Sequence, residues 1–241
     1  MRSGNPALRG TVFTAEEAHA SQGRTMTIQG TTNKTLLLLL FTVLTASWVW
    51  GNSEGRMILI FSAVVLGLIT AIITIVKKEW SGITAPVYAL IEGIVIGGVS
   101  LYFERMYPGI VVQAVALTFG TLFCLLLAYK SRLIKATENF KLGVISATGA
   151  VALFYLISII LSFFGIQMTL IHDSGPFGII FSLIVVSIAA LNLVLDFDFI
   201  ENGEKNRAPK YMEWYGAFGL IITLIWLYLE ILRLLSKMRS R

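Results

Sequence analysis

Seven long apolar runs constrain this chain of 241 residues more than any other feature of its sequence. A transmembrane helix needs about 20 apolar residues to cross a bilayer core that is roughly 30 Å thick, and most of the runs reach that length. Lipid offers no partner to a backbone N–H or C=O group, so each run is predicted to be a helix rather than a strand. The predicted spans are residues 35–51, 57–76, 84–103, 109–129, 143–165, 176–200 and 213–235.

The composition of the chain excludes most soluble classes of protein. Hydrophobic residues make up 56% of the sequence and charged residues 14%, whereas a soluble domain carries about 25% charged residues. The single cysteine, Cys124, excludes a scaffold built on disulfides. The sequence therefore predicts an all-α polytopic membrane protein. A flexible cytoplasmic tail is expected over residues 1–34 and a seven-helix transmembrane domain over residues 35–241.

The distribution of Lys and Arg predicts the orientation of the chain in the membrane. The N-terminal tail and the second, fourth and sixth connections together carry 13 of these residues, against 2 in the first, third and fifth connections. Because basic loops stay in the cytoplasm, the N-terminus is predicted to be cytoplasmic. The basic C-terminal tail disagrees, since seven crossings place it outside. Either the other loops dominate, which we favour, or one span is re-entrant and both termini are cytoplasmic.

Three carboxylates lie inside the apolar runs, at Glu92, Asp196 and Glu230. A charged side chain at lipid depth costs about 2.5–3.5 kcal/mol on insertion scales, so it usually has a partner or a task. Asn192 precedes Asp196 by four residues and shares its helical face. Ser182 lies fourteen residues before Asp196, close to four whole turns, and extends the same face. On the last span a second polar stripe ends at Glu230.

Two helices that each carry an acid in a polar stripe are expected to meet along those stripes. Two carboxyl groups in a low dielectric cannot both ionise cheaply, so Asp196 and Glu230 would share one proton and titrate as a unit. Such a pair is a pH-responsive latch, and its carboxylates would also attract Ca²⁺, which prefers oxygen ligands. Two alternatives stay open: Asp196 reaches the cytoplasmic interface, and Glu230 pairs with Arg233 on its own helix. Glu92 is a candidate for lining a polar cavity.

The predicted pairing carries a geometric condition. If the last span enters lipid at Glu213, a rise of 1.5 Å per residue places Glu230 roughly 25 Å deep, whereas Asp196 lies only a few residues from the cytoplasmic face. The two acids can meet only if the first two turns of the last span project into the cytoplasm, or if the sixth span extends past Ile200.

The remaining motifs point to helix packing rather than to chemistry. Gly93 and Gly97 form a small-xxx-small pair in the third span, which is typical of two helices in close contact. The sequence contains no catalytic triad, zinc spacing, phosphate loop or dinucleotide fingerprint. We therefore expect a protein that is not an enzyme, holds no cofactor and binds no nucleic acid.

Five segments carry a resemblance to a known family. They are residues 3–9 with Phe13, residues 26–30 leading into 33–35, the small-residue patch 97–101, the stretch Leu-Asp-Phe-Asp-Phe-Ile at 195–200, and the run Leu-Tyr-Leu-Glu-Ile-Leu-Arg-Leu-Leu at 227–235. Together they resemble the bacterial branch of the Bax inhibitor-1/YccA-like family of transmembrane Bax inhibitor motif proteins.

The resemblance implies a seven-helix bundle with the last helix at its centre, in a bacterial inner membrane. Some members of the family are pH-sensitive calcium leak channels in which two acids on helices six and seven form the sensor, and here those positions are Asp196 and Glu230. A basic residue after the second helix is similar to Lys77 or Lys78, which are candidate countercharges. Glu230 stands where the family has Asp, and Glu92 has no counterpart in the family pattern.

A pH-sensitive calcium leak channel is therefore the predicted function. The candidate pore or cation-binding residues are Glu92, Asn192 and Asp198, and the candidate Ca²⁺ ligands are Asp196 and Glu230. An alternative is a non-transporting regulator that binds a membrane protease or a stress-response partner through its N-terminal tail. A proton-coupled solute porter is a third interpretation.

Overall fold

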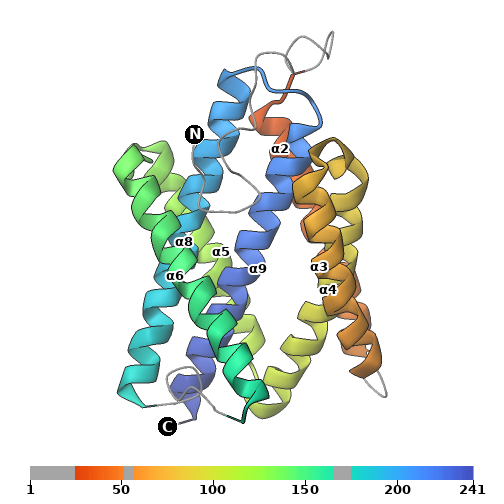
Figure 1. Ribbon diagram of the computed structural model, residues 1–241, viewed down its shortest axis with the longest axis vertical. Helices are drawn as coiled ribbons and strands as arrows, with labels where there is room; N and C mark the ends of the chain where they lie inside the picture. Colours follow the sequence, from red (N-terminus) through yellow and green to blue (C-terminus); the bar gives the residue numbers. More distant parts are fainter. Residues whose placement is uncertain (1–24, 52–56, 166–174, 241) are drawn as a thin grey trace.

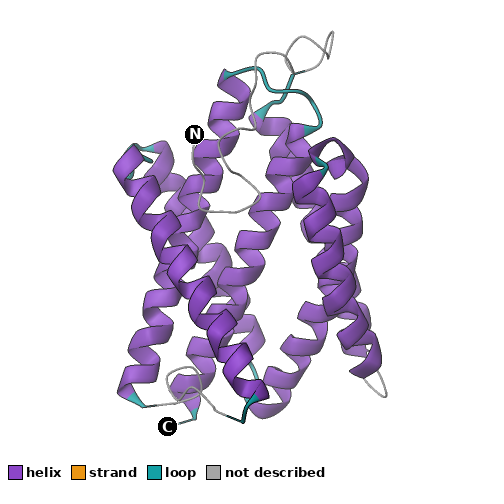
Figure 2. Ribbon diagram, in the orientation of Figure 1, coloured by secondary structure: helices purple, strands orange, loops and turns teal. Residues whose placement is uncertain are grey.

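The computed structural model describes residues 25–51, 57–165 and 175–240. Helices make up the regular structure of these ranges (Figure 2). They are α2 (Ile28–Gly51), α3 (Met57–Val76), the short 3₁₀ helix η2 (Lys78–Trp80), α4 (Ser81–Met106), α5 (Ile110–Lys130), α6 (Glu138–Phe163), α8 (Pro176–Lys205) and α9 (Met212–Arg239). Within the described ranges seven helical segments are long and apolar enough to cross a membrane. The chain is therefore an integral membrane protein with the predicted all-α architecture.

Several helices extend beyond the predicted spans because their terminal turns are polar. α2 begins at Ile28 rather than at residue 35, and the Thr27 hydroxyl caps it by accepting the Gly30 N–H at 3.0 Å. Residues 28–34, which were expected to belong to the tail, are thus helical. α8 likewise continues past the predicted end at Ile200 and stops at Lys205.

α9 lies at the centre of the bundle, as the family resemblance implies. It packs against α2, α4, α5 and α8. In Figure 1 it runs between the group formed by α2, α3 and α4 and the group formed by α5, α6 and α8. In its most apolar stretch 67% of the residues are buried, against 17% in α3. The polar side chains of α9 must therefore find partners inside the protein, whereas α3 is left mostly to lipid.

α2 and α4 approach closely at the predicted small-residue pair. A Cβ atom on Gly93 would lie 1.9 Å from the hydroxyl oxygen of Thr45, and one on Gly97 would lie 2.7 Å from the carbonyl oxygen of Ala46. Neither distance leaves room for a methyl group. The prediction of tight helix packing at these glycines is confirmed.

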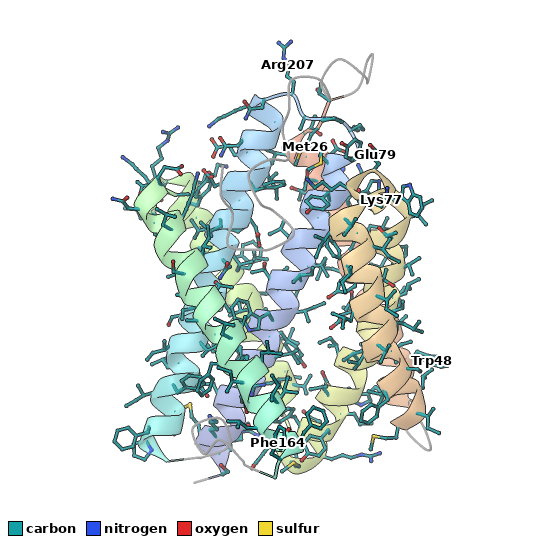
Figure 3. The ribbon with its side chains drawn as sticks, viewed as in Figure 1. Met26, Trp48, Lys77, Glu79, Phe164 and Arg207 are labelled. Atoms are coloured by element: carbon teal, nitrogen blue, oxygen red, sulfur yellow. The ribbon has the colours of Figure 1, made fainter. Side chains whose placement is uncertain are left out.

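The first helix begins and the last helix ends at opposite ends of the bundle (Figure 1). Lys77, Glu79 and Arg207 lie at the end where α2 begins, which we call the Arg207 end, and Trp48 and Phe164 lie at the other (Figure 3). This arrangement corresponds to seven crossings, the alternative that the charge distribution favours.

Candidate functional site

A buried polar stripe runs along α8, as the spacing of its residues predicts. Ser182, Asn192 and Asp196 are 1%, 2% and 0% exposed. The Asn192 amide donates hydrogen bonds of 2.8 Å to the Thr148 hydroxyl of α6 and to the Ile188 carbonyl oxygen of its own helix. Because Asp196 is fully buried, the alternative in which its carboxylate reaches the membrane interface does not hold. We call Ser182, Asn192 and Asp196 the α8 stripe.

Two oxygen atoms of the α8 stripe are available to a further ligand. In the part of the chain that the structure describes, Ser182 Oγ and Asn192 Oδ1 are buried and have no hydrogen-bond partner. Buried polar atoms nearly always have one, and leaving one unmet costs about 1–3 kcal/mol. The stripe thus combines a fully buried carboxyl group with oxygen atoms whose bonding capacity is unused.

Glu230 forms a second buried polar group with two other residues. It is 2% exposed, and its carboxylate accepts hydrogen bonds from the Tyr155 hydroxyl at 3.0 Å and from Arg233 Nη1 at 3.0 Å. Arg233 also donates to the Tyr155 hydroxyl at 2.6 Å, and its guanidinium carbon lies 5.1 Å from the centre of the Tyr155 ring. The alternative in which Glu230 pairs with Arg233 is therefore confirmed. We call these three residues the Glu230 triad.

Two contacts give the register of α8 against α9, which pack side by side and run antiparallel (Figure 1). Near the Arg207 end, a Cβ atom on Gly216 would lie 3.3 Å from the side chain of Ile200. Near the opposite end, the Lys237 ammonium group donates to the Gly178 carbonyl oxygen at 3.0 Å. Ile200 is therefore level with Gly216, and Gly178 is level with Lys237.

This register separates the two acids that were expected to share a proton. Asp196 lies one turn before Ile200 and is level with Leu220, whereas Glu230 lies ten residues further along α9. At 1.5 Å per residue the two side chains are about 15 Å apart along the helix axes. In this structure they form neither the expected hydrogen-bonded latch nor a shared Ca²⁺ site. Among the described residues no three His, Cys, Asp or Glu side chains gather so that they could hold a metal ion.

The extension of α8 past Ile200 was one of the two conditions for the pairing, and on its own it is not sufficient. α8 gains its extra turn at the Arg207 end, but α9 begins at Met212, level with that same turn. Glu230 therefore lies more than four turns along α9 from its start at Met212. Ser182, four residues after Gly178, is level with Arg233, so the far end of the α8 stripe reaches the height of the Glu230 triad.

A further buried acid, Glu213, is absent from the candidates that the sequence suggested. It lies in the first turn of α9 and is 0% exposed. Its carboxylate accepts hydrogen bonds from the N–H and hydroxyl groups of Thr27 at 2.9 and 2.8 Å, and it pairs with Lys210 at 2.6 Å and with Lys34. A Cβ atom on Gly30 would lie 2.1 Å from Glu213 Oε1. We call Glu213, Thr27, Lys34 and Lys210 the Glu213 cluster.

The Glu213 cluster closes the Arg207 end of the bundle together with a short backbone pairing. Thr25 forms an isolated antiparallel bridge with Pro209, and the Met26 N–H donates to the Ala208 carbonyl oxygen at 2.7 Å. The start of α2 is thus fixed to the connection between α8 and α9. In the sequence the only sign of this role is that Glu213 stands next to Met212, Trp214 and Tyr215. Without the fold, that acid looks like the aqueous boundary of the span.

The two lysines suggested as countercharges have other surroundings. Lys78 lies over the ring of Tyr215, 5.9 Å from its centre, and Lys77 is exposed at the Arg207 end. Asp198, a candidate cation-binding residue, pairs with Lys141 of α6 at 2.8 Å. The charge of Asp198 is therefore balanced by a neighbouring helix at the end of the bundle.

Glu92 lies between α3 and α4, away from the α8 stripe. Its side chain is partly buried, and a Cβ atom on Gly67 of α3 would lie 3.2 Å from Glu92 Oε2. The carboxylate interacts with the hydroxyl of Tyr88, one turn earlier on α4. Glu92 and Asp196 consequently belong to different helix interfaces.

The fold and these groups define a class of protein: an integral membrane bundle of seven helices in which the last helix is central and carries buried acids near both ends. The particular family follows from the sequence. A family model described as Bax inhibitor 1 like matches residues 5–240, and the chain belongs to that family. No curated protein and no solved structure matches the chain. The family resemblance is confirmed, while the bacterial branch stays a prediction.

Proposed function

We propose that this protein is a proton-regulated leak for cations, Ca²⁺ among them, through the interior of its bundle. The observation that carries the proposal is the α8 stripe, in which the fully buried Asp196 shares one helix face with Asn192 and Ser182. Among the described residues, Asn192 Oδ1 and Ser182 Oγ are buried and have no hydrogen-bond partner. An ionisable side chain inside a membrane protein is costly and marks ion or proton pathways. Oxygen atoms are also the ligands that hard cations such as Ca²⁺ prefer.

The two acids act in series in this proposal, because the register keeps them apart. An ionised Asp196 attracts a cation into the α8 stripe, and a protonated Asp196 does not. The Glu230 triad stands at the height of the other end of the stripe, where the arginine holds the carboxylate. Because Glu230 is held by Arg233, the triad is a fixed polar contact further along the same route.

Calcium flux into liposomes that contain the full chain tests this proposal, measured across a series of pH values. In the wild type, flux rises with pH as Asp196 ionises. In the variant Asp196→Asn, flux is low and independent of pH. The loss is on the order of tenfold or more at high pH, since about 1.4 kcal/mol of lost cation attraction already changes a rate tenfold.

The control for this assay is Glu79→Gln. Glu79 is an exposed acid at the Arg207 end (Figure 3), so its replacement removes a carboxylate without touching the bundle interior. This variant retains the wild-type pH profile. Absence of flux in the wild type, or an unchanged profile in Asp196→Asn, would overturn the proposal.

The non-transporting regulator remains the alternative function. It assigns the docking of a membrane protease or stress-response partner to the N-terminal tail, of which residues 1–24 lie outside the described ranges. It gives no calcium flux in the wild type, so the same assay separates the two functions. Both proposals are of a non-enzymatic protein with its N-terminus in the cytoplasm.

A further inference from the structure

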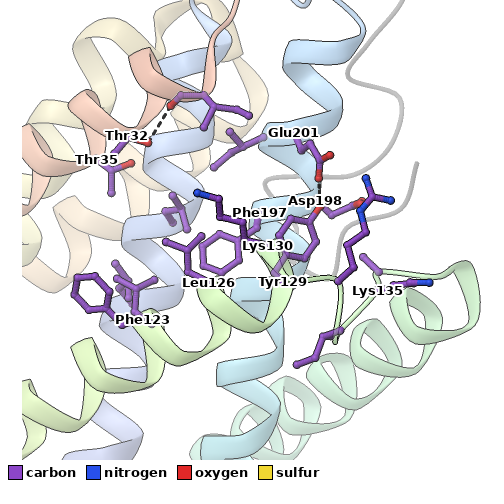
Figure 4. Close-up of a pocket in the computed structure, with 18 of the residues that line it drawn as sticks. Thr32, Thr35, Phe123, Leu126, Tyr129, Lys130, Lys135, Phe197, Asp198 and Glu201 are labelled. Atoms are coloured by element: carbon purple, nitrogen blue, oxygen red, sulfur yellow. Dashed lines mark hydrogen bonds between the residues drawn. The ribbon is translucent and has the colours of Figure 1, made fainter.

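A groove of about 980 Å³ opens between α2 and α5 near the Arg207 end, and α8 and α9 form its floor (Figure 4). Its deeper part is apolar and is lined by Leu36 and Leu39 of α2 and by Phe119, Leu122, Phe123 and Leu126 of α5. Leu36 and Phe123 are 60% and 63% exposed. In a membrane these side chains face lipid, so the groove opens sideways into the hydrocarbon.

The rim of the groove is basic. Lys130, Arg132 and Lys135 come from the end of α5 and from the turn after it, and all three are exposed. Figure 4 shows Lys130 extending into the groove. None of the three forms a salt bridge within the described ranges of the chain. Three positive charges therefore lie within six residues at the mouth of an apolar groove.

Two acids lie at the same rim, and Glu201 interacts electrostatically with Arg132, but the basic residues of the rim outnumber these acids. Glu201 pairs with Lys205 on the next turn of α8 and also accepts a hydrogen bond from the Tyr129 hydroxyl. Asp198 pairs with Lys141. The rim thus remains available to an anion from outside the protein.

The depth of the groove matches one leaflet of a bilayer. From Lys130 to Phe119 the wall of α5 covers twelve residues, and the eleven steps between them rise about 16 Å at 1.5 Å per residue. The hydrocarbon core is roughly 30 Å thick, so this is about half of it. An acyl chain that follows the groove from the rim would end near the middle of the membrane.

We propose that this groove binds a phospholipid with an anionic headgroup from the leaflet at the Arg207 end. Lys130, Arg132 and Lys135 hold the phosphate and the headgroup, and one acyl chain lies along the apolar wall between α2 and α5. Basic pockets between transmembrane helices at the membrane surface suit anionic headgroups in this way. The site does not depend on the α8 stripe or on the proposed leak.

Native mass spectrometry of the full chain in detergent tests the site, with phosphatidylglycerol and phosphatidylcholine of identical acyl chains as probes. The wild type binds phosphatidylglycerol more tightly. The triple variant Lys130→Gln/Arg132→Gln/Lys135→Gln binds it on the order of a hundredfold more weakly, since each cation near a charged headgroup changes affinity about fivefold. The control Lys77→Gln/Lys78→Gln/Arg207→Gln removes three charges from the same end outside the groove and retains wild-type binding.

A second pair of variants tests the apolar wall. Leu126→Trp fills the groove and weakens phosphatidylglycerol binding, whereas Leu127→Trp, at an exposed position outside the groove lining, leaves it unchanged. Equal binding of the two lipids, or a triple variant that binds like the wild type, would overturn the proposal. Competition by glycerol phosphate that is as strong as competition by the intact lipid would also overturn the proposal. That result would mean that the site binds an anion and does not bind an acyl chain. Occupation of the groove by a second copy or by another part of the chain would leave every variant equal to the wild type.

Discussion

At the residue scale, the buried acids of this protein differ in the groups that contact their carboxylates. The Glu213 carboxylate pairs with two lysines and accepts hydrogen bonds from the N–H and hydroxyl groups of Thr27. The Glu230 carboxylate pairs with Arg233 and accepts a hydrogen bond from the Tyr155 hydroxyl. Asp196 shares its helix face with Asn192 and Ser182. Because a buried charge is tolerated when it is paired and hydrogen-bonded, we interpret the Glu213 cluster as a structural clamp.

Removing the charge of Glu213 tests the clamp. The variant Glu213→Gln weakens the contact with both lysines and Thr27, and we expect a loss of stability of about 2 kcal/mol, the range for hydrogen bonds to a charged group. A lower Tm of the purified protein in detergent measures the effect. The matched control is Glu138→Gln, because Glu138 also pairs with a lysine three residues away but its side chain is 74% exposed.

The control variant is expected to change stability by less than about 1 kcal/mol, as surface ion pairs do. Equal Tm shifts in Glu213→Gln and Glu138→Gln would contradict the structural role of the cluster.

At the scale of the elements, α2 and α4 depend on the absence of side chains where they cross. Hydrophobic burial does not drive helices together in lipid, so close backbone approach and packing must do so. The two glycines of α4 provide that approach, and the Glu213 cluster fixes the start of α2 against α9. The position of α2 is thus set near its start and again about three quarters of the way along its length.

The variant Gly93→Ala is expected to push α2 and α4 apart, because its methyl group would lie 1.9 Å from the Thr45 hydroxyl oxygen. Overpacking of this kind costs about 1–3 kcal/mol, seen as a lower Tm in detergent. Gly120→Ala on α5 is the comparison, since nothing lies within 4 Å of a Cβ atom there. That change keeps or slightly raises the Tm through helix propensity. A Tm that Gly93→Ala leaves unchanged would contradict the close contact between α2 and α4 at this position.

At the scale of the whole molecule, seven crossings place the two termini on opposite sides of the membrane. The connections that carry most of the Lys and Arg gather at the Arg207 end, and the last turn of α9 with Lys237 and Arg239 lies at the other. From the positive-inside rule we expect the Arg207 end to lie in the cytoplasm. The C-terminal cations are outnumbered by those of the opposite loops.

A topology reporter fused after Arg241 tests this arrangement in cells. An alkaline phosphatase reporter, which is active only outside the cytoplasm, is expected to be active there, and the same reporter placed before Met1 is expected to be inactive. A cytoplasmic C-terminus would mean that one of the seven helices does not cross.

Much of the architecture was predictable from local sequence. The lengths of the apolar runs predict seven helices, because lipid leaves the backbone no other way to satisfy its hydrogen bonds. The spacing of Ser182, Asn192 and Asp196 predicts one buried stripe, since a helix brings residues at these intervals to one face. The central place of α9 came from the family resemblance, which the match over residues 5–240 supports.

Only the tertiary structure decided which acid meets which partner. The outer faces of membrane helices are as apolar as the inner faces, so the hydrophobic pattern sets neither the rotation nor the relative height of two helices. The height of α9 against α8 follows from the connection over residues 206–211 and from the contacts that the Glu213 cluster makes with α2. That height buries Glu213 and keeps Asp196 about 15 Å from Glu230. The sequence by itself therefore determined the helices and the composition of the α8 stripe, and the packing of those helices determined the pairing of the charges.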